Sequence, residues 1–232
     1  MTHAQRKVDT SRLVVSKIPD KYPGHMIRQR ENDWDKRYRE SNTPWEEESH
    51  SQDLMSALAQ FSKDKVTVLE IGCGLGVNAA RMAELGLEVD ATDISSECIH
   101  RATKHSSRTT KGLVRFTQLD FIQDEIEKKY DIVFDKGCLH SFVTQDSYNF
   151  FAKKVSGCLN KDGLWINISG NADNRDDLTK RRELSFPRIS LRQIAEAVEP
   201  HFEVLEIRRG QFGSRNNFYS WVGVFQKRSF FY

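Results

Sequence analysis

The stretch EIGCGLG at residues 70–76 decides the fold of this chain. The apolar run Val66 to Ile71 leads into it and predicts a buried strand, while Val77 to Leu85 predicts a helix that Gly86 ends. A glycine-rich turn between a strand and a helix lets the backbone approach a ligand and directs helix N-terminal amides at it. The sequence therefore predicts a ligand-binding strand, turn and helix in this order.

Strands and helices alternate outward from this unit. An amphipathic helix is predicted before it, at Gln52 to Phe61. Further strands are predicted at Leu87–Thr92, Val114–Leu119, Tyr130–Phe134 and Leu164–Ile168, and helices from Ser95 or Ser96 to Lys104 and from Thr144 to Leu159. Repeated alternation of this kind predicts a mainly parallel sheet covered by helices on both faces.

In the last third of the sequence, strands and helices no longer alternate. Ser190 and Gln193 form a capping box that starts a helix ending before Pro200. Two extended runs follow, Phe202–Arg208 and Phe218–Phe225, with no helix between them, which predicts an antiparallel pair closing the sheet. The predicted fold class is α/β, a Rossmann-like doubly wound sheet of seven strands, mainly parallel with an antiparallel C-terminal strand.

Length and charge limit the possible functions. A chain of 232 residues that is 38% hydrophobic can bury one substantial core, so we expect one domain over residues 32–232 and a flexible N-terminal arm over 1–31. The formal charge of +2 gives no wide positive field, so no nucleic-acid partner is expected. No apolar run is long enough to span a membrane and no signal peptide is visible, which predicts a cytoplasmic protein.

The four cysteines show no paired ligand spacing. Cys73, Cys98, Cys138 and Cys158 are widely separated, so no structural zinc or other metal is expected, and they are interpreted as reduced, packed thiols. The dinucleotide fingerprint is not matched either, because its third glycine would fall at Val77. The turn therefore does not have the spacing of a pyrophosphate site.

At this point the sequence resembles the class I S-adenosylmethionine-dependent methyltransferases, over about Asn32 to Lys227. The resemblance implies S-adenosylmethionine as the cofactor. In that family an acidic residue precedes a G-x-G-x-G turn that cradles the methionine and ribose portions of the cofactor. Glu70 matches the acidic residue near the cofactor's amino end, and the matching turn residues are Gly72, Cys73, Gly74 and Gly76.

Two further strand ends match the family. Asp93, followed by Ile94, ends the second strand where a carboxylate accepts hydrogen bonds from the ribose hydroxyls. Asp120 and Phe121 end the third strand and resemble the adenine-reading motif, the carboxylate accepting from the exocyclic amine and the ring packing nearby. Taken singly, an aspartate at a strand end is more often a helix cap or a solvated residue. The joint placement of Asp93 and Asp120 at successive strand ends reverses this preference and favours a site.

The fourth strand ends at the family's most substrate-dependent position. The chain has no Asn or Asp followed by two prolines and an aromatic residue there, which disfavours a nucleobase amino methyltransferase. Asp135 is predicted beside the cofactor and as a catalytic residue. His140 is predicted to face the substrate as a general base, with capping of the following helix as the alternative. Cys138 is interpreted as packing.

Before the core, Trp34, Tyr38 and Trp45 form a W-x-x-x-Y with a trailing T-P-W. This pattern resembles thiol, thiopurine and tellurite-type methyltransferases, in which the segment folds over the cofactor. The resemblance implies that residues 32–48 cover the cofactor and that Trp45 contacts it. Trp34 and Tyr38 are also explained as one helical face packing on the domain. The acceptor implied is a small molecule with a soft nucleophile, such as a thiol.

Arginines and lysines concentrate from Arg175 to Arg192 around Phe186. Phe186 and Arg188 are candidate substrate residues, although such a run is more often a solvated face. Two alternative functions stay open: a protein lysine N-methyltransferase, because residues 135–137 also resemble a motif of that branch, and a non-catalytic cofactor-binding module. The chain is expected to be a monomer or a homodimer.

Overall fold

The computed structural model describes residues 15–17, 31–46, 49–62, 67–106, 114–172, 188–212 and 218–229. The main sheet consists of β2 (Thr67–Ile71), β3 (Glu88–Asp93), β4 (Val114–Gln118), β6 (Tyr130–Lys136), β7 (Leu159–Gly170), β8 (Phe202–Phe212) and β9 (Phe218–Lys227). The helices are α1 (Glu31–Arg39), α2 (Gln52–Phe61), α3 (Val77–Glu84), α4 (Ser96–Ser106), α5 (Gln145–Cys158) and α6 (Leu191–Val198).

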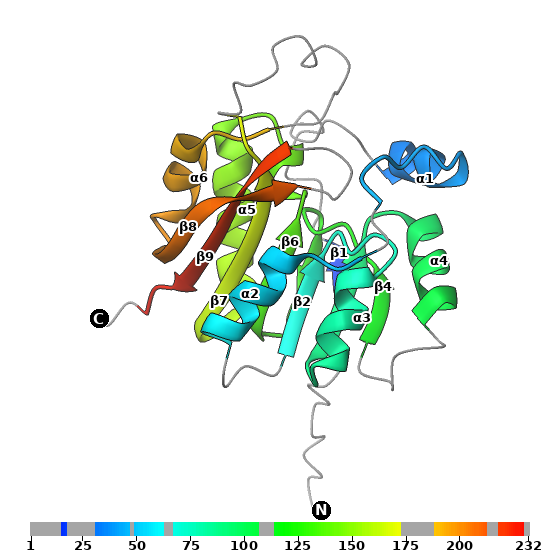
Figure 1. The fold of residues 1–232 in the computed structure, drawn as a ribbon, viewed down its shortest axis with the longest axis horizontal. Coiled ribbons are helices and arrows are strands. Elements are labelled where there is room, and N and C mark those ends of the chain that lie inside the picture. Colours follow the sequence, from blue (N-terminus) through cyan, green and yellow to red (C-terminus); the bar gives the residue numbers. More distant parts are fainter. Residues whose placement is uncertain are drawn as a thin grey trace, which may run out of the picture.

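The seven strands lie in the order β4-β3-β2-β6-β7-β9-β8 (Figure 1). The first five are parallel, and β9 pairs antiparallel with both β7 and β8. The first strand of this sheet along the chain is β2, from which the chain runs outward to β4, then returns to β6 beside β2 and proceeds in the opposite direction. The reversal creates a crevice at the carboxyl ends of β2 and β6, where open sheets of this kind bind ligands. The predicted fold class is confirmed.

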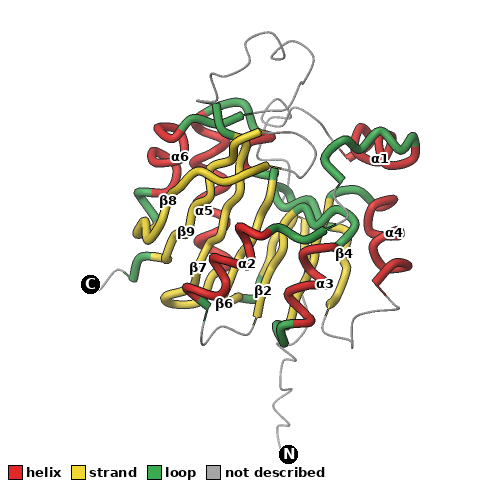
Figure 2. Tube along the Cα trace, in the orientation of Figure 1, coloured by secondary structure: helices red, strands yellow, loops and turns green. Residues whose placement is uncertain are grey.

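Helices cover both faces of the sheet. Figure 2 shows α2 and α3 in front of the strands and α5 behind them. Successive residues of β2 serve the two faces: Val68 packs in the cluster with Leu54 of α2, and Leu69 packs in the cluster with Phe151 of α5. Because β2 is covered on both faces, its apolar residues are buried against helices on either side of the sheet.

The helix ends follow the sequence signals. Thr144 and Ser190 each form a capping box with the third residue of α5 and α6 respectively, and Gly86 adopts a positive φ of 92° directly after α3. The predicted boundaries therefore lie within a few residues of those observed. The longest extension is in β7, which begins at Leu159 and includes the predicted turn at residues 160–163.

Two short strands were not predicted. β1 (Val15–Lys17), inside the predicted N-terminal arm, pairs antiparallel with β5 (Asp124–Ile126). β5 lies between β4 and β6, where a doubly wound sheet commonly has a crossover helix, and a tight turn at residues 121–123 leads into it. Three-residue strands carry too little periodicity to be recognised in a sequence.

Asp90 is the centre of a buried ion cluster at the amino-terminal half of the sheet. Its carboxylate accepts from the Arg115 guanidinium at 2.6 and 3.2 Å, from Lys128 Nζ at 2.8 Å and from the Tyr130 hydroxyl at 2.9 Å. Burial tends to raise the pKa of Asp90, but the hydrogen bonds from these three residues outweigh it and leave the pKa below its ordinary value.

Asp90→Asn should therefore lower the free energy of unfolding by about 2 to 3 kcal/mol, less than for a fully buried pair because the Arg115 side chain is 46% exposed. Urea denaturation measures this loss. The pKa of Asp90 is depressed in the fold, so the difference should persist at neutral pH and shrink as the pH falls through that lowered value. Glu88→Gln, at the exposed first residue of β3, is the matched control; an equal loss there would contradict the assignment.

Candidate functional site

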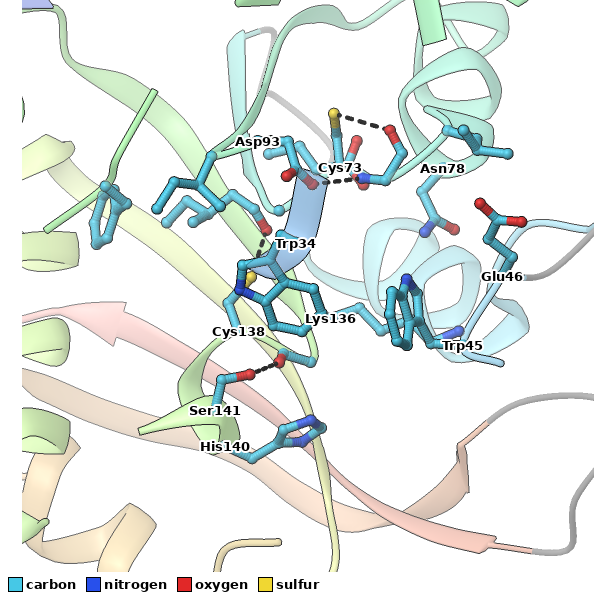
Figure 3. Close-up of a pocket in the computed structure, with 18 of the residues that line it drawn as sticks. Trp34, Trp45, Glu46, Cys73, Asn78, Asp93, Lys136, Cys138, His140 and Ser141 are labelled. Carbon is cyan, nitrogen blue, oxygen red and sulfur yellow. Dashed lines mark hydrogen bonds between the residues drawn. The ribbon is translucent and has the colours of Figure 1, made fainter. Parts of the chain in front are cut away.

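A cavity of about 800 Å³ lies at the carboxyl ends of the parallel strands. It is lined by the turn after β2, the ends of β3 and β4, the loop after β6 and the segment from α1 to Ser49. In Figure 3, Asp93 and Asn78 lie on one side of it, His140 and Ser141 on the other, and Trp34 between them. Phe151 of α5 and Phe212 of β8 complete the lining, so residues from seven separate stretches of the sequence share one pocket.

The turn after β2 depends on its three glycines. Gly72, Gly74 and Gly76 have φ values of +70°, +55° and +79°, a region that other residues seldom adopt. A Cβ atom on Gly72 would lie 2.2 Å from Cys138 Sγ, and one on Gly76 would lie 2.6 Å from the Phe116 ring. Gly72 and Gly74 line the cavity, whereas Gly76 does not and instead packs against the domain.

Asp93 ties this turn to the end of β3. One carboxylate oxygen accepts from the backbone N–H of Gly74 at 3.1 Å and the other from that of Ser95 at 3.0 Å. Burial raises the pKa of Asp93, although these two hydrogen bonds oppose the rise. Asp93 and its neighbour Ile94 both line the cavity, as the sequence predicts, and each carboxylate oxygen retains accepting capacity for a ligand hydroxyl.

Asp120 and Phe121 line the same cavity after β4. Asp120 also forms a local turn, since its Oδ1 accepts from the N–H groups of Ile122 and Gln123 at 2.9 and 3.3 Å. Phe121 is buried and packs on the ring of Phe151, 4.9 Å between centroids. Asp120 therefore both stabilises a local turn and lines the cavity.

Glu70 carries a buried carboxyl group whose Oε2 has no hydrogen-bond partner. Burial, followed by the nearby charge of Asp93, raises the pKa of Glu70 to about 8, while Lys136 and Asn78 oppose the rise. Glu46 at the covering segment has a second unpartnered buried oxygen, Oε1. Four carboxyl groups line this end of the cavity, from Glu46, Glu70, Asp93 and Asp120, so it suits a ligand with positive charge.

Asp35 holds the covering segment in place from α1. Its carboxylate accepts from the Ser95 hydroxyl, from Ser96 Oγ at 3.1 Å and from the Glu97 N–H at 3.1 Å, at the start of α4. A carboxylate at a helix N-terminus is favoured by the exposed N–H groups and by the helix dipole. Because Asp35 lies on the same helix as Trp34 and Tyr38, this contact fixes α1 beside the cavity.

The aromatic residues of this segment form one cluster. Trp45 lies edge-on to Trp34 at 5.2 Å, and Trp45 Nε1 donates to the Tyr38 hydroxyl at 3.4 Å. All three line the cavity, so Trp34 and Tyr38 belong both to a packed helical face and to the pocket. The Arg37 guanidinium stands 4.1 Å from the Trp45 ring centroid and already occupies one face of that indole.

Asp135 does not line the cavity. It is fully buried, and its carboxylate accepts from Trp165 Nε1 at 2.8 Å, Asn167 Nδ2 at 2.9 Å and the Leu139 N–H at 3.1 Å. The predictions that Asp135 contacts the cofactor and acts in catalysis therefore need correction. Its side chain points to the other face of the sheet and anchors the short 3₁₀ helix Leu139–Ser141, so Asp135 is a positioning residue.

His140 lines the cavity but is not arranged as a general base. Its Nδ1 accepts from the Gly170 N–H at 2.6 Å, so this nitrogen holds no proton and the neutral ring carries its hydrogen on Nε2. The one unprotonated nitrogen is thereby blocked. The alternative that His140 caps the next helix is wrong, because Thr144 is the cap of α5.

The cysteines of the pocket are thiols. Burial raises the pKa of both Cys73 and Cys138 well above the ordinary value, with nearby carboxylates adding to the effect. Cys138 Sγ donates to the Ile71 carbonyl at 3.2 Å and touches the glycine turn. This position fits the packing role predicted for Cys138.

The substrate prediction after β7 is not supported by the described residues. Phe186 lies outside them, and Arg188 is half-buried but absent from the cavity lining. Sequence reasoning missed Arg37, Glu46, Asn78, Lys136 and Phe212, which do line it. Lys136 and Glu46 are direct neighbours of predicted residues, whereas Phe212 comes from β8, far along the chain, and carries no local signal.

Together, the doubly wound sheet, the glycine turn and the strand-end carboxylates define a protein that binds a nucleoside-containing ligand. Residues 69–165 match the family model described as a methyltransferase domain. An uncharacterized methyltransferase of Schizosaccharomyces pombe is 33% identical over 110 residues, covering 47% of this chain and 75% of that protein. The chain therefore belongs to the class I S-adenosylmethionine-dependent methyltransferase family.

Solved structures agree on the fold. A structure reported for the conversion of a disulfide bond into a thioacetal group in echinomycin biosynthesis aligns with a TM-score of 0.71 at 19% identity, covering 85% of this chain and 92% of that one. The N-methyltransferase NodS from Bradyrhizobium japonicum, with S-adenosyl-L-homocysteine, aligns at 0.63 and 19% identity over 82% and 91%. Within the described ranges, no helix is long and apolar enough to cross a membrane.

The contact between Gly72 and Cys138 gives a specific test. Gly72→Ala should destabilise the protein by about 1 to 2 kcal/mol from the positive φ alone, plus the clash with Sγ. Cys138→Ala removes that sulfur, so the double variant should recover about 1 kcal/mol or more relative to additivity in urea denaturation. Gly74→Ala, whose Cβ would meet only Tyr38 at 3.6 Å, should not be rescued. Additive losses at Gly72 and Cys138 would contradict the packed turn.

Proposed function

We propose that this protein binds S-adenosylmethionine in the described cavity and transfers its methyl group to a small-molecule acceptor with a soft nucleophile, such as a thiol. The observation that carries the proposal is the convergence of the glycine turn, Asp93 and Asp120 on one cavity. These groups lie on three different strand ends. S-adenosylmethionine is a nucleoside joined to an amino acid, and a site for it needs polar groups from all three strand ends in one cavity.

The residues present fit this cofactor. The unpartnered Glu70 Oε2 suits the ammonium of the methionine portion, Asp93 suits the ribose hydroxyls, and Asp120 with Phe121 suits the adenine. Gly72 and Gly74 line the cavity without side chains, so the backbone there can approach the methionine and ribose portions closely. An acidic cavity end also matches the net positive charge of the molecule.

The covering segment favours a small acceptor. Trp34 and Tyr38 of α1 and Trp45 after it line the cavity, and the hydrogen bonds of Asp35 to the start of α4 hold this covering segment in place. In the proposed complex the acceptor shares the cavity with the cofactor beside this segment, which displaces water from the reacting atoms. A lysine of a folded protein substrate would have to pass this covering segment.

The bound cofactor supplies an electrophilic methyl group on a sulfonium sulfur. The protein's own residues hold the donor and the acceptor in line, exclude water and orient the acceptor, and positioning of this kind accounts for most of the rate. No covalent intermediate with the protein is needed, in agreement with the protonated state of Cys73 and Cys138.

A labelling experiment tests the function. The purified chain is incubated with methyl-labelled S-adenosylmethionine and a cell extract, and separately with a panel of low-molecular-mass thiols, and products are separated by mass. Label in small molecules is expected. Label confined to a protein band would establish the protein-methylating alternative, and cofactor binding without any labelled product would establish the non-catalytic one. Asp93→Ala, expected to weaken cofactor binding by about 1.5 to 3 kcal/mol, is the impaired control.

Glu70 makes cofactor affinity pH-dependent. Only its ionised form attracts the ammonium, and with a pKa of about 8 the carboxyl must lose a proton on binding at neutral pH. Between pH 6 and 7.5, where the ligand ammonium stays charged, affinity should rise by up to about tenfold per pH unit. Calorimetry measures it. Glu70→Gln should flatten the profile and the exposed Glu84→Gln should not; an unchanged slope in Glu70→Gln would remove Glu70 from the site.

A further inference from the structure

The cavity end opposite Asp93 has a wall of hydrogen-bond donors and positive charge. Lys136 Nζ lies 5.4 Å from the ring centroid of Phe212, and the His140 ring lies 5.2 Å from the same ring. A Cβ added to Gly137 would stand 3.4 Å from Phe212 and 3.6 Å from His140 Nε2. Lys136, His140 and Phe212 are therefore neighbours around the backbone of Gly137, and all line the cavity.

The hydrogen bonds within this wall determine which of its atoms act as donors. His140 Nδ1 accepts from the Gly170 N–H, which leaves Nε2 as the ring's donor. The Ser141 hydroxyl donates to the Gly137 carbonyl and Cys138 Sγ donates to the Ile71 carbonyl, as Figure 3 shows. Neither thiol nor hydroxyl is placed to take a proton from an acceptor.

The carboxylate next to Lys136 in the sequence does not face the cavity either. Asp135, one residue before Lys136, is fully buried and already accepts three hydrogen bonds from Trp165, Asn167 and Leu139. Among the described residues, the carboxyl groups that line the cavity come from the covering segment and the ends of β2 to β4, the cofactor end in the proposed function. The donor wall therefore offers an acceptor positive charge and N–H groups but no base.

We infer that this wall binds an acceptor whose nucleophilic atom is already negatively charged, with Lys136 Nζ and the Nε2–H of His140 facing that charge and Phe212 packing on the adjoining apolar part. The inference rests on the proposed function and defines its substrate class. The bond from the methyl carbon to the acceptor forms as its bond to the sulfonium sulfur breaks, and that electron pair stays on the sulfur. An anionic acceptor thus becomes a neutral product, and no proton is left for the protein to remove.

Lys136 has one competing role, since its charge also acts on Glu70. A lysine there would equally suit the carboxylate of the methionine portion of the cofactor. The two roles differ in a measurable way. If Lys136 meets the acceptor, its removal weakens binding of an anionic acceptor more than binding of the cofactor, which then changes only through Glu70. If Lys136 meets the cofactor, the larger loss is in cofactor binding.

The test measures the ionisation of a bound thiol without turnover. Thiophenol is added to the protein carrying S-adenosylhomocysteine, and ultraviolet difference spectra across pH separate thiol from thiolate. The pKa of bound thiophenol is expected to fall by about one pH unit or more in the wild type. In Lys136→Met that fall should be largely lost and thiophenolate affinity should drop about tenfold, with a smaller change in S-adenosylhomocysteine affinity that follows the rise in the pKa of Glu70.

Matched variants keep the result interpretable. Lys136→Arg retains the charge and should keep the lowered thiol pKa, which guards against a misfolded methionine variant. Lys153→Met removes an exposed lysine of α5 outside the cavity and should behave as wild type. With labelled donor, kcat/KM is measured across pH for thiols of different acidity. It should rise with pH, and the pH midpoint should follow the pKa of each thiol and not that of a common protein group.

Three results would overturn the inference. The first is that neutral thiophenol binds preferentially, or that thiophenol does not bind. The second is a loss of S-adenosylhomocysteine affinity in Lys136→Met while the pKa of the bound thiol stays unchanged. The third is one pH midpoint of kcat/KM shared by all thiols. If S-adenosylhomocysteine itself gives no heat in calorimetry, the proposed function fails and this inference with it. Normal heat with a neutral bound thiol overturns this inference alone.

Discussion

The carboxylate of Asp93 is the contact on which the site depends. It accepts from Gly74 and Ser95 and so links the glycine turn after β2 to the residue that precedes α4, in addition to the backbone hydrogen bond from Cys73 to the Thr92 carbonyl. Because Asp35 of α1 binds to the same α4 start, the covering segment is positioned through this junction as well. A single buried carboxylate thereby fixes the relative places of the turn, the second strand end and the aromatic cover.

A second buried carboxylate organises the opposite wall. The Asp135 carboxylate accepts hydrogen bonds from Trp165, Asn167 and the Leu139 N–H, and so holds the 3₁₀ turn against β7. The same turn places the His140 ring where the Gly170 N–H, also from β7, sets its tautomer. The chemistry of the pocket surface is thus decided by hydrogen bonds on the buried side of the backbone, which explains why an acidic residue follows the strand without reaching the ligand.

The fold and one end of the pocket follow from local patterns, and the other end does not. Glycine spacing, strand-end aspartates and capping boxes at Thr144 and Ser190 are short-range signals, and the structure has them where they were predicted. The direction of a side chain at a strand end is not such a signal. Asp135 and Lys136 alternate across the sheet, so the residue chosen for its chemistry points away and its neighbour lines the cavity. Phe212 joins them only through the pairing of β8 with β9.

The pocket has carboxyl groups around the glycine turn and a cationic wall at Lys136, whose charge also reaches Glu70. In the proposed function, a positively charged donor is attracted to the carboxyl groups and a negatively charged acceptor to Lys136, and their reaction cancels both charges. Such a reaction is favoured where water does not stabilise the separated ions. The cover formed by Trp34, Tyr38 and Trp45 therefore affects the rate as well as binding, because excluding water strengthens the field of both ends at once. Under the inferred binding of the acceptor at Lys136, an amine would gain nothing from this arrangement, since its proton has no destination on the cationic wall and its charged form is repelled by Lys136.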